Sequence, residues 1–481
     1  MEAKNKQHHV VVLVLGDLGR SPRMQYHAMS LSKLENVKVS LVGYDGTKCI
    51  PQVEQNPNIT KVFIPEFKGL SFMKAWKPTF ILFAGLKCAW LGLGLLLTLL
   101  VRLPFGRPQL VLVQTPPAVP TTIIAWMVCV LRGCSLLIDW HNIGYTVMAH
   151  SHGKTHPLVK AYKWLERGVA GRAQAHFCVT RAMKTWLRSE FHLPTDAVHV
   201  LYDKPPAFFQ PVAEKDRVEL FRRLLQDPER KVLDKDTLFQ RLAQGGGGSI
   251  DPVPHVVVSS TSWSADEDFG LLLHALERLD QENRLAIRPP LGLARPLVVF
   301  VTGKGPQKAY YEEKIRDLQL SGVEIHTLWL QAEDYPRLLG ASDLGVCLHT
   351  STSGLDLPMK VVDMFGAGLP VCAVGYKSLP ELVQHGVNGL TFSDSGELAQ
   401  HLADLLHQGG RKLSALRANV QHKQVRWEEN WDNVAKQVMM DLVQQQSRLC
   451  CPIVMWLIIP SLVVFISCGF IVRLNDTSWT P

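Results

Sequence analysis

Three polar segments, each following an apolar run, hold the residues best suited to chemistry in this chain. They are Gly16–Met24, Asp139–Tyr145 and Gly354–Asp363. Polar or glycine-rich residues just beyond the carboxyl end of a buried strand are where open α/β sheets bind their ligands. The pattern therefore predicts two nucleotide-binding-type sheets that face one cleft.

The segment that ends at Asp363 has the composition of a diphosphate site. A hydroxyl-rich loop that runs from His349 through Ser353 and Gly354 leads into a predicted helix N-terminus, where unpaired amides and the helix dipole favour an anion. Lys360 would neutralise a diphosphate, and Asp363, one turn later on the same helix face, would bind ribose hydroxyls. The alternative is that Lys360 and Asp363 only pair with each other on a solvated surface.

A second candidate for the same ligand follows another predicted strand. The backbone of Gly303 and Gly305 can approach phosphate oxygens closely, and Lys304 between them adds a positive charge. Trp263, which follows the first strand of the second half, is expected to line the sugar or base pocket.

The acidic run Asp266–Asp268 matches a short metal-holding motif, but Ser264 with Glu267 three residues later is also a capping box. We favour the capping role, since acidic residues in a first helical turn are stabilised by the helix dipole. No metal site is predicted.

In the first half of the chain, the predicted phosphate contacts follow the first strand. The glycines Gly16 and Gly19 let the backbone approach a ligand, and Arg20 and Arg23 supply planar donors suited to a diphosphate. Lys154, in a polar loop farther along, is a candidate for a further phosphate contact.

Three residues are candidates for a general base. Asp17 follows the first strand, and Asp139 and His141 follow a later one. A base must lie within hydrogen-bond reach of the proton that it removes, which a sequence does not show, so Asp17 and the Asp139/His141 pair stay open at this point. Asp139 has the further alternative of only orienting His141.

Composition bounds the class of protein. The chain has 481 residues, 47% of them hydrophobic, which predicts two domains with two cores. Its formal charge of +8 comes without an arginine-rich arm, so a nucleic-acid partner is not expected. Its ten cysteines include no C-x-x-C pair, which is typical of a reduced, cytosolic chain.

Apolar runs predict the strands of two doubly wound parallel sheets, because they are continuous rather than alternating. The first set is 10–15, 37–42, 110–113, 136–138 and 175–179, and the second is 256–259, 297–302, 323–326, 344–347 and 371–374. Segments with helical periodicity lie between them. We expect an N-terminal domain over 1–209, a flexible linker over 210–254 that includes the glycine run at 245–248, and a C-terminal domain over 255–447 whose last helix crosses back to the first domain.

Two hydrophobic segments predict contact with a membrane. Residues 450–472 carry no charge and are long enough to cross a bilayer, as a C-terminal anchor would. Residues 79–103 are interrupted by Lys87, so insertion into the membrane surface is expected there, with a buried core helix as the alternative.

Five segments together resemble the chitobiosyldiphosphodolichol beta-mannosyltransferase family: 10–26, 138–145, 258–269, 301–306 and, above all, 341–371. The resemblance implies a GT-B fold, which is two Rossmann-like domains. The C-terminal domain is then the donor domain, with GDP-mannose as the donor, and the N-terminal domain is the acceptor domain. The resemblance implies dolichol-diphosphate-linked chitobiose as the acceptor, a β1,4 product formed with inversion, and an endoplasmic reticulum membrane with the catalytic domains on its cytosolic face. Other mannosyltransferases of the same pathway are expected partners.

The resemblance also has departures. GT-B enzymes often carry two glutamates eight residues apart; Asp363 takes the place of the second, and Leu355 the place of the first, as in the family named above. The family usually has an N-terminal anchor, whereas this chain starts with polar residues. No metal cofactor is expected to be required, with dependence on Mg²⁺ as the alternative. A related glycosyltransferase with another donor or lipid-linked acceptor, and a membrane-tethered binding protein without turnover, are the other hypotheses.

Overall fold

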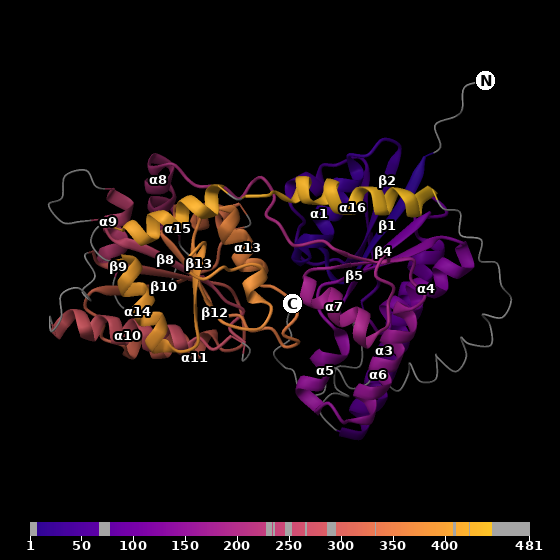
Figure 1. Ribbon diagram of the computed structural model, residues 1–481, viewed down its shortest axis with the longest axis horizontal. Coiled ribbons are helices and arrows are strands. Elements are labelled where there is room, and N and C mark those ends of the chain that lie inside the picture. The colour runs from indigo at the N-terminus through magenta and orange to yellow at the C-terminus, as the bar shows by residue number, and fades with distance from the viewer. Residues whose placement is uncertain are drawn as a thin grey trace. The chain divides into compact units, whose positions relative to one another are not determined.

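The computed structural model describes residues 7–66, 77–227, 233, 236–245, 253–264, 267–285, 295–331, 333–406, 410–422 and 424–444. The chain divides into two compact units. The first consists of Met1–Tyr202 and Glu428–Pro481, and the second of Asp203–Trp427. Each unit is built on its own parallel sheet (Figure 1).

The sheet of the first unit has seven strands within the described residues, in the order β3-β2-β1-β4-β5-β6-β7. Strands β1 and β4 are neighbours, but the chain leaves them in opposite directions across the sheet. Because crossovers between parallel strands are right-handed, the helices that follow β1 and β4 lie on opposite faces (Figure 1). The elements of this unit are β1 (His8–Asp17), η1 (Leu18–Arg20), α1 (Pro22–Ser32), β2 (Val37–Tyr44), α2 (Pro51–Glu54), β3 (Ile59–Phe63), α3 (Lys77–Val101), β4 (Leu110–Thr115), α4 (Thr121–Arg132), β5 (Ser135–Trp140), α5 (Gly144–His152), α6 (Pro157–Ala170), β6 (Ala175–Cys178), α7 (Arg181–Glu190), β7 (Val198–Val200) and α16 (Trp427–Gln444).

The sheet of the second unit has six strands within the described residues, in the order β10-β9-β8-β11-β12-β13. The apolar runs predicted as strands in both halves are confirmed. The elements of this unit are α8 (Glu214–Leu225), α9 (Thr237–Gln244), β8 (His255–Ser260), α10 (Gly270–Leu285), β9 (Leu297–Thr302), α11 (Lys308–Asp317), β10 (Val323–Leu328), α12 (Asp334–Ala341), β11 (Leu344–Cys347), α13 (Met359–Gly366), β12 (Val371–Val374), η3 (Leu379–Glu381), β13 (Gly389–Phe392), α14 (Ser395–Leu406) and α15 (Arg411–His422).

Alternate residues of the second sheet belong to different cores. Val257 and Val299 pack into the cluster that includes residues of α10 and α14. Val258 and Val298 pack into the cluster that includes residues of α8, α9 and α13. Successive side chains of a strand point to opposite faces, so these continuous apolar strands are buried between two layers of helices.

The expectation of a flexible linker over 210–254 was wrong for the parts of it that form α8 and α9. Leu220, Phe221 and Leu224 recur at helical spacing on α8 and are at most 3% exposed. They pack with Phe239 of α9 against Phe300 of β9. The charged side chains of α8 lie mostly on its solvent side, and residues 246–252 lie outside the described part of the chain.

The last described helix, α16, belongs to the first unit, as the sequence predicted. The indole N–H of Trp431 donates a hydrogen bond to His27 Nδ1 on α1 (3.1 Å). The Ser135 hydroxyl donates to the Leu442 carbonyl (3.1 Å). Buried hydrogen bonds as well as apolar packing therefore hold α16 in the first unit.

The predicted C-terminal anchor, residues 450–472, lies outside the described residues. Among the helices that the structure describes, none combines the length and the apolar composition needed to cross a bilayer. Residues 79–103 largely coincide with α3.

We predict that Phe221→Ala lowers the free energy of unfolding by about 3–5 kcal/mol, because it removes a fully buried ring from the second unit's core. Chemical denaturation of the full chain measures the change. Lys215→Ala, at an exposed position of the same helix, is the control and should change little. Equal effects of the two substitutions would contradict the packing of α8 described above.

Candidate functional site

The second sheet has a topological switch point between β8 and β11. These strands are neighbours, with Val258 opposite Gly345, and the chain continues from them in opposite directions across the sheet. The crevice outside the carboxyl ends of two such strands is where open α/β sheets bind ligands. The loop after β8 carries Glu267, and the loop after β11 carries His349.

Glu267 is 2% exposed and joins these two loops. Its Oε2 accepts hydrogen bonds from the Thr261 hydroxyl (2.7 Å) and the Ser262 backbone N–H (2.6 Å). Its Oε1 accepts a hydrogen bond from the ammonium of Lys360 at the start of α13. The prediction of a capping box with Ser264 was therefore wrong for this carboxylate, because its partners lie outside the helix end that it was expected to close.

His349 lies between two carboxylates. Its Nδ1 is 3.8 Å from Glu267 Oε1, and its Nε2 is 3.7 Å from Asp356 Oδ2. Burial favours the neutral ring, but the neighbouring carboxylates of Asp356 and Glu267 outweigh burial and raise the pKa of His349 to about 9. The imidazole is therefore a cation at neutral pH. Together with Lys360 it places two positive charges at the switch point, an arrangement suited to a diphosphate.

The predicted loop residues Ser353 and Gly354 shape the loop that carries His349. The Ser353 hydroxyl donates to Asp356 Oδ1 (3.2 Å), and Ser351 is also hydrogen-bonded to that carboxylate. Gly354 has φ +71°, a conformation that favours glycine. These residues thus fix Asp356, which in turn holds the imidazole ring.

Lys360 and Asp363 do not form the surface pair considered in the sequence analysis. Lys360 is bonded to Glu267, whereas burial and the neighbouring Asp203 raise the pKa of Asp363 well above its usual range. A carboxyl group in its neutral form both donates and accepts hydrogen bonds, and a ribose hydroxyl can pair with it in either direction.

The glycines of the 303–305 loop are needed for packing between loops. A Cβ at Gly303 would lie 1.8 Å from the Thr261 carbonyl oxygen, and one at Gly305 would lie 1.7 Å from that of Ser262. Trp263 is fully buried, and its indole N–H donates to the Gly303 carbonyl (3.2 Å). The prediction that Trp263 lines a ligand pocket was therefore wrong; it joins the loops that follow β8 and β9.

The two exposed lysines among the predicted site residues lie in different units. Lys304 Nζ is 3.8 Å from the ring centroid of Trp329, a cation–π contact at the edge of the second sheet. Lys154 lies in the turn between α5 and α6 of the first unit.

In the first unit, Asp17 fastens the loop after β1 to the loop after β2. Its carboxylate accepts hydrogen bonds from the Gly19 N–H (2.9 Å), the Thr47 N–H (2.9 and 3.0 Å) and the Thr47 hydroxyl (2.8 Å). The approach is close enough that a Cβ at Gly19 would lie 2.3 Å from the Thr47 carbonyl oxygen. Arg20 is also near this carboxylate, at 3.7 Å. A Cβ at Gly16 would make only ordinary van der Waals contacts, so no close approach requires a glycine there.

The assignments of Asp139 as a base and of Arg23 as a phosphate ligand were wrong. Asp139 is 0% and Arg23 1% exposed, and they form a two-point ion pair with distances of 2.7 and 2.8 Å. His27 Nε2 lies 3.3 Å from the same carboxylate. Burial alone would raise the pKa of Asp139, but Arg23 and His27 lower it below its usual range. A carboxylate fixed inside the core has no route to an acceptor hydroxyl.

His141 is the other base candidate of this loop. It is half-buried directly after β5, and its backbone N–H donates to the Thr115 carbonyl at the end of β4 (3.0 Å). Strands β1 and β4 form the switch point of the first sheet. His141 therefore lies in a loop beside the crevice expected for a ligand of this unit.

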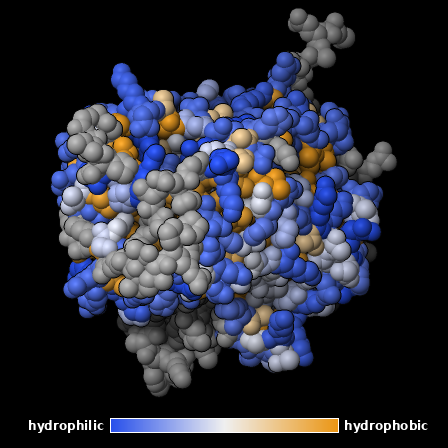
Figure 2. All heavy atoms as spheres, turned by 60° about the vertical axis from the view of Figure 1, so that its left-hand side comes forward, coloured by the Kyte–Doolittle hydropathy of each residue, from blue (hydrophilic) through white to orange (hydrophobic). Residues whose placement is uncertain are grey.

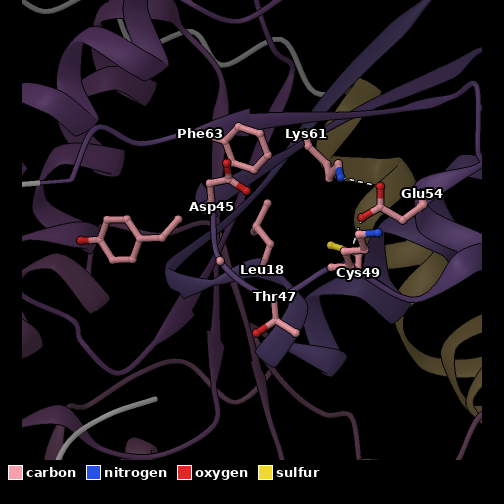
Figure 3. Close-up of a pocket in the computed structure, with 10 residues that line it drawn as sticks. Leu18, Asp45, Thr47, Cys49, Glu54, Lys61 and Phe63 are labelled. Atoms are coloured by element: carbon pink, nitrogen blue, oxygen red, sulfur yellow. Dashed lines mark hydrogen bonds and ion pairs between the residues drawn. The ribbon is translucent and has the colours of Figure 1, made fainter. Parts of the chain in front are cut away.

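A pocket of about 320 Å³ opens at the carboxyl ends of β1, β2 and β3 (Figure 3). Leu18, Thr47 and Phe63 line it, together with the ion pair of Lys61 and Glu54 (Figure 3). Thr47 is also the residue that binds Asp17, so the loop that fixes Asp17 forms one wall of this cavity.

Comparison with known proteins places this arrangement in a family. Residues 255–408 match the model of the family described as glycosyl transferases group 1. The chain is 41% identical over 449 residues to the chitobiosyldiphosphodolichol beta-mannosyltransferase of Pongo abelii, which covers 90% of this chain and 93% of that protein. The chain belongs to the chitobiosyldiphosphodolichol beta-mannosyltransferase family. It is therefore a glycosyltransferase.

Two further proteins are similar to this chain, one in sequence and one in structure. The chain is 41% identical over 471 residues to the Arabidopsis thaliana protein named UDP-glycosyltransferase TURAN, covering 92% of this chain and 99% of that protein. The crystal structure of Anabaena HepE with UDP and glucose superposes with a TM-score of 0.58 at 15% identity, covering 91% of this chain and all of that one. The second likeness shows the fold, which is GT-B.

We predict that Asp139→Asn lowers the free energy of unfolding by about 3–5 kcal/mol, because it leaves Arg23 buried without its counter-charge. Asp45→Asn, at an exposed position of the same unit, should leave stability nearly unchanged. Urea denaturation of both variants measures the difference. Unaltered stability combined with a large loss of turnover in Asp139→Asn would instead restore Asp139 as a base.

Proposed function

We propose that this chain transfers mannose from GDP-mannose to dolichol-diphosphate-linked chitobiose, forming a β1,4 linkage with inversion at the anomeric carbon. The observation that carries the proposal is the pair of cations, Lys360 and His349, at the switch point of the second sheet in a member of this family. The names of the mannosyltransferase relatives support the acceptor class.

Inversion requires a single displacement. The O4 hydroxyl of the distal sugar attacks the anomeric carbon of the α-linked mannosyl group, and the bond from that carbon to the diphosphate oxygen breaks. The electron pair of the broken bond stays on GDP, which gains negative charge. Lys360 and His349 would stabilise this charge, and donors fixed in advance where charge develops are an effective source of catalysis.

The proton of the acceptor hydroxyl needs a base, and we assign this role to His141. Its ring is half-buried in the loop after β5. Asp17 is the weaker candidate because its two oxygens already accept four hydrogen bonds from the loops that they join. A neutral imidazole is well suited to accept a proton near neutral pH.

We further propose that no metal ion is required. Among the described residues, no group of three or more His, Cys, Asp and Glu side chains is arranged to hold a metal. Two side-chain cations already supply positive charge where the diphosphate is expected to bind.

The acceptor is a lipid, and we propose that the enzyme works on the cytosolic face of the endoplasmic reticulum membrane. One face of α3 supports this location: Leu86, Trp90, Leu93, Leu97 and Val101 are between 43% and 73% exposed at helical spacing. An exposed apolar stripe that contains a tryptophan is typical of helices that lie in a membrane surface. The cysteines of the described residues are free thiols, which fits a reducing compartment.

A second candidate function uses another donor. A relative with 41% identity carries the name UDP-glycosyltransferase, so a UDP-sugar is the alternative to GDP-mannose. The same reaction geometry serves both donors, because the diphosphate is common to them.

We predict that the purified full chain transfers labelled mannose from GDP-mannose to phytanyl-diphosphate chitobiose in the presence of a chelator, and that β-mannosidase releases the label. Lys360→Ala should lower kcat/KM by about 10²–10³-fold, because it removes one cation from the leaving diphosphate. Lys412→Ala, a lysine 70% exposed in the same unit, is the matched control.

Three outcomes would contradict this proposal. Transfer from a UDP-sugar in preference to GDP-mannose would favour the alternative donor. Restoration of turnover only by a divalent ion would overturn the metal-free mechanism. Equal activity of the Lys360 and Lys412 variants would remove Lys360 from the donor site.

We also predict that deletion of residues 450–481 weakens membrane association and that Leu93→Glu with Leu97→Glu in the truncated chain removes the remainder. The two charges would lie on the exposed apolar face of α3 and oppose its insertion into lipid. Flotation with liposomes measures the bound fraction. Tyr310→Glu, 53% exposed in the second unit, is the control. Full flotation of the doubly altered truncated chain would contradict the role of α3.

A further inference from the structure

Glu267 has no part in the reaction described above, yet it contacts both cations of the donor site. Its Oε2 is anchored to its own loop by Thr261 and Ser262. Its Oε1 faces Lys360 and His349, which come from the segment that follows β11. The two oxygens therefore have different tasks: one fixes the carboxylate, and the other holds the cations.

We propose that Glu267 is a positioning residue of the donor site, which holds the Lys360 ammonium and the His349 imidazolium side by side for the diphosphate of the nucleotide sugar. This inference rests on the proposed function, since it assumes that the ligand of the two cations is the donor diphosphate.

The geometry supports positioning rather than simple charge balance. A lysine side chain carries about 2 kcal/mol of rotamer entropy, and an anchored partner reduces what is lost when a ligand binds. The Lys360 side chain is 28% and that of His349 24% exposed, while that of Glu267 is 3% exposed. The cations thus remain reachable from solvent, whereas the carboxylate lies behind them.

The charge of His349 depends on the groups that surround it. Glu267 contacts one ring nitrogen and Asp356 the other, and both favour the protonated ring, while Lys360 opposes it. Removing the charge of Glu267 leaves Asp356 alone against Lys360. The pKa of His349 should then fall, and affinity for the donor should be lost at a lower pH.

A purely structural role for Glu267 is the competing explanation, and the chain offers a matched control. Asp343 is an anchored carboxylate at the opposite ends of the same two strands: it accepts from the Val256 N–H at the start of β8 (2.9 Å) and pairs with Arg217 (3.4 Å). It precedes β11 directly. Asp343→Asn therefore disturbs the same strand pair away from the donor site.

The test compares Glu267→Gln and Asp343→Asn with the unaltered chain in the GDP-mannose transfer assay. The amide in Glu267→Gln keeps the size of the side chain and an oxygen acceptor but removes its charge. We expect kcat/KM for the donor to fall about 10–100-fold while the KM for the acceptor stays within about twofold.

The unaltered chain should lose donor affinity as the pH rises through about 9, where His349 loses its proton, and Glu267→Gln should lose it at a lower pH. Asp343→Asn should change thermal stability and leave the donor KM and the pH profile unaltered.

An unchanged donor KM and pH profile in Glu267→Gln would overturn the inference, whatever happens to stability. Absence of turnover in the unaltered chain would instead count against the proposed function. Should Glu267→Gln fail to fold, Glu267→Asp takes its place, because it keeps the charge but withdraws the carboxylate from Lys360 and His349. The inference predicts that GDP binds this variant more weakly than the unaltered chain and that its binding declines at a lower pH; the same affinity and the same decline in both would overturn it.

Discussion

The proposed donor site depends on the pairing of β8 with β11. Because these parallel strands are neighbours and the chain leaves them in opposite directions, the loops that follow them separate at the carboxyl edge of the sheet. Glu267 comes from one loop, and His349 and Lys360 come from the segment that follows the other. Their ion pairs connect residues that are 82 and 93 positions apart, so the site exists only once the sheet has formed.

Two clusters in this chain show how burial decides what the same charged groups do. In the first unit, Asp139, Arg23 and His27 are all at most 1% exposed, so the ion pair of Arg23 with Asp139 is closed to solvent. In the second unit, Glu267 is equally hidden, but its partners Lys360 and His349 keep about a quarter of their side-chain surface. A closed cluster such as that of Asp139 and Arg23 contributes to stability when intact and is costly to break. A cluster with exposed cations can exchange an internal partner for a ligand.

Much of the fold could be predicted because a strand that is buried on both faces is a continuous apolar run in the sequence. The continuous apolar runs of β1 and β9 are typical of central parallel strands, and both were predicted within a few residues. The edge strands β3, β7 and β13 were missed because they are short and partly exposed, with polar or small residues among the apolar ones. Helix α8 was taken for a linker because its charged face concealed the apolar spacing of Leu220, Phe221 and Leu224.

Residues of the candidate site could be predicted only where the sequence around them itself indicates a ligand. Lys360 stands out because a cation next to a predicted helix N-terminus suits an anion, and His349 stands out because it begins the polar loop that leads to this helix. Glu267 had a plausible local partner, Ser264, and its true partner Lys360 is distant in sequence, so no local pattern could favour the correct reading. The sequence pattern favours Asp139 as a base and Arg23 as a phosphate ligand, and only the three-dimensional packing reveals that they are buried together.

The central claim is that the two cations at the switch point recognise a diphosphate, and calorimetric titration of the full chain with GDP and with GMP tests it most directly. The second phosphate is the group that distinguishes these ligands. We predict that GDP binds at least about tenfold more tightly than GMP, a difference of about 1.4 kcal/mol, and that the difference shrinks as salt screens the charges. Equal affinities for GDP and GMP at low salt would contradict the claim.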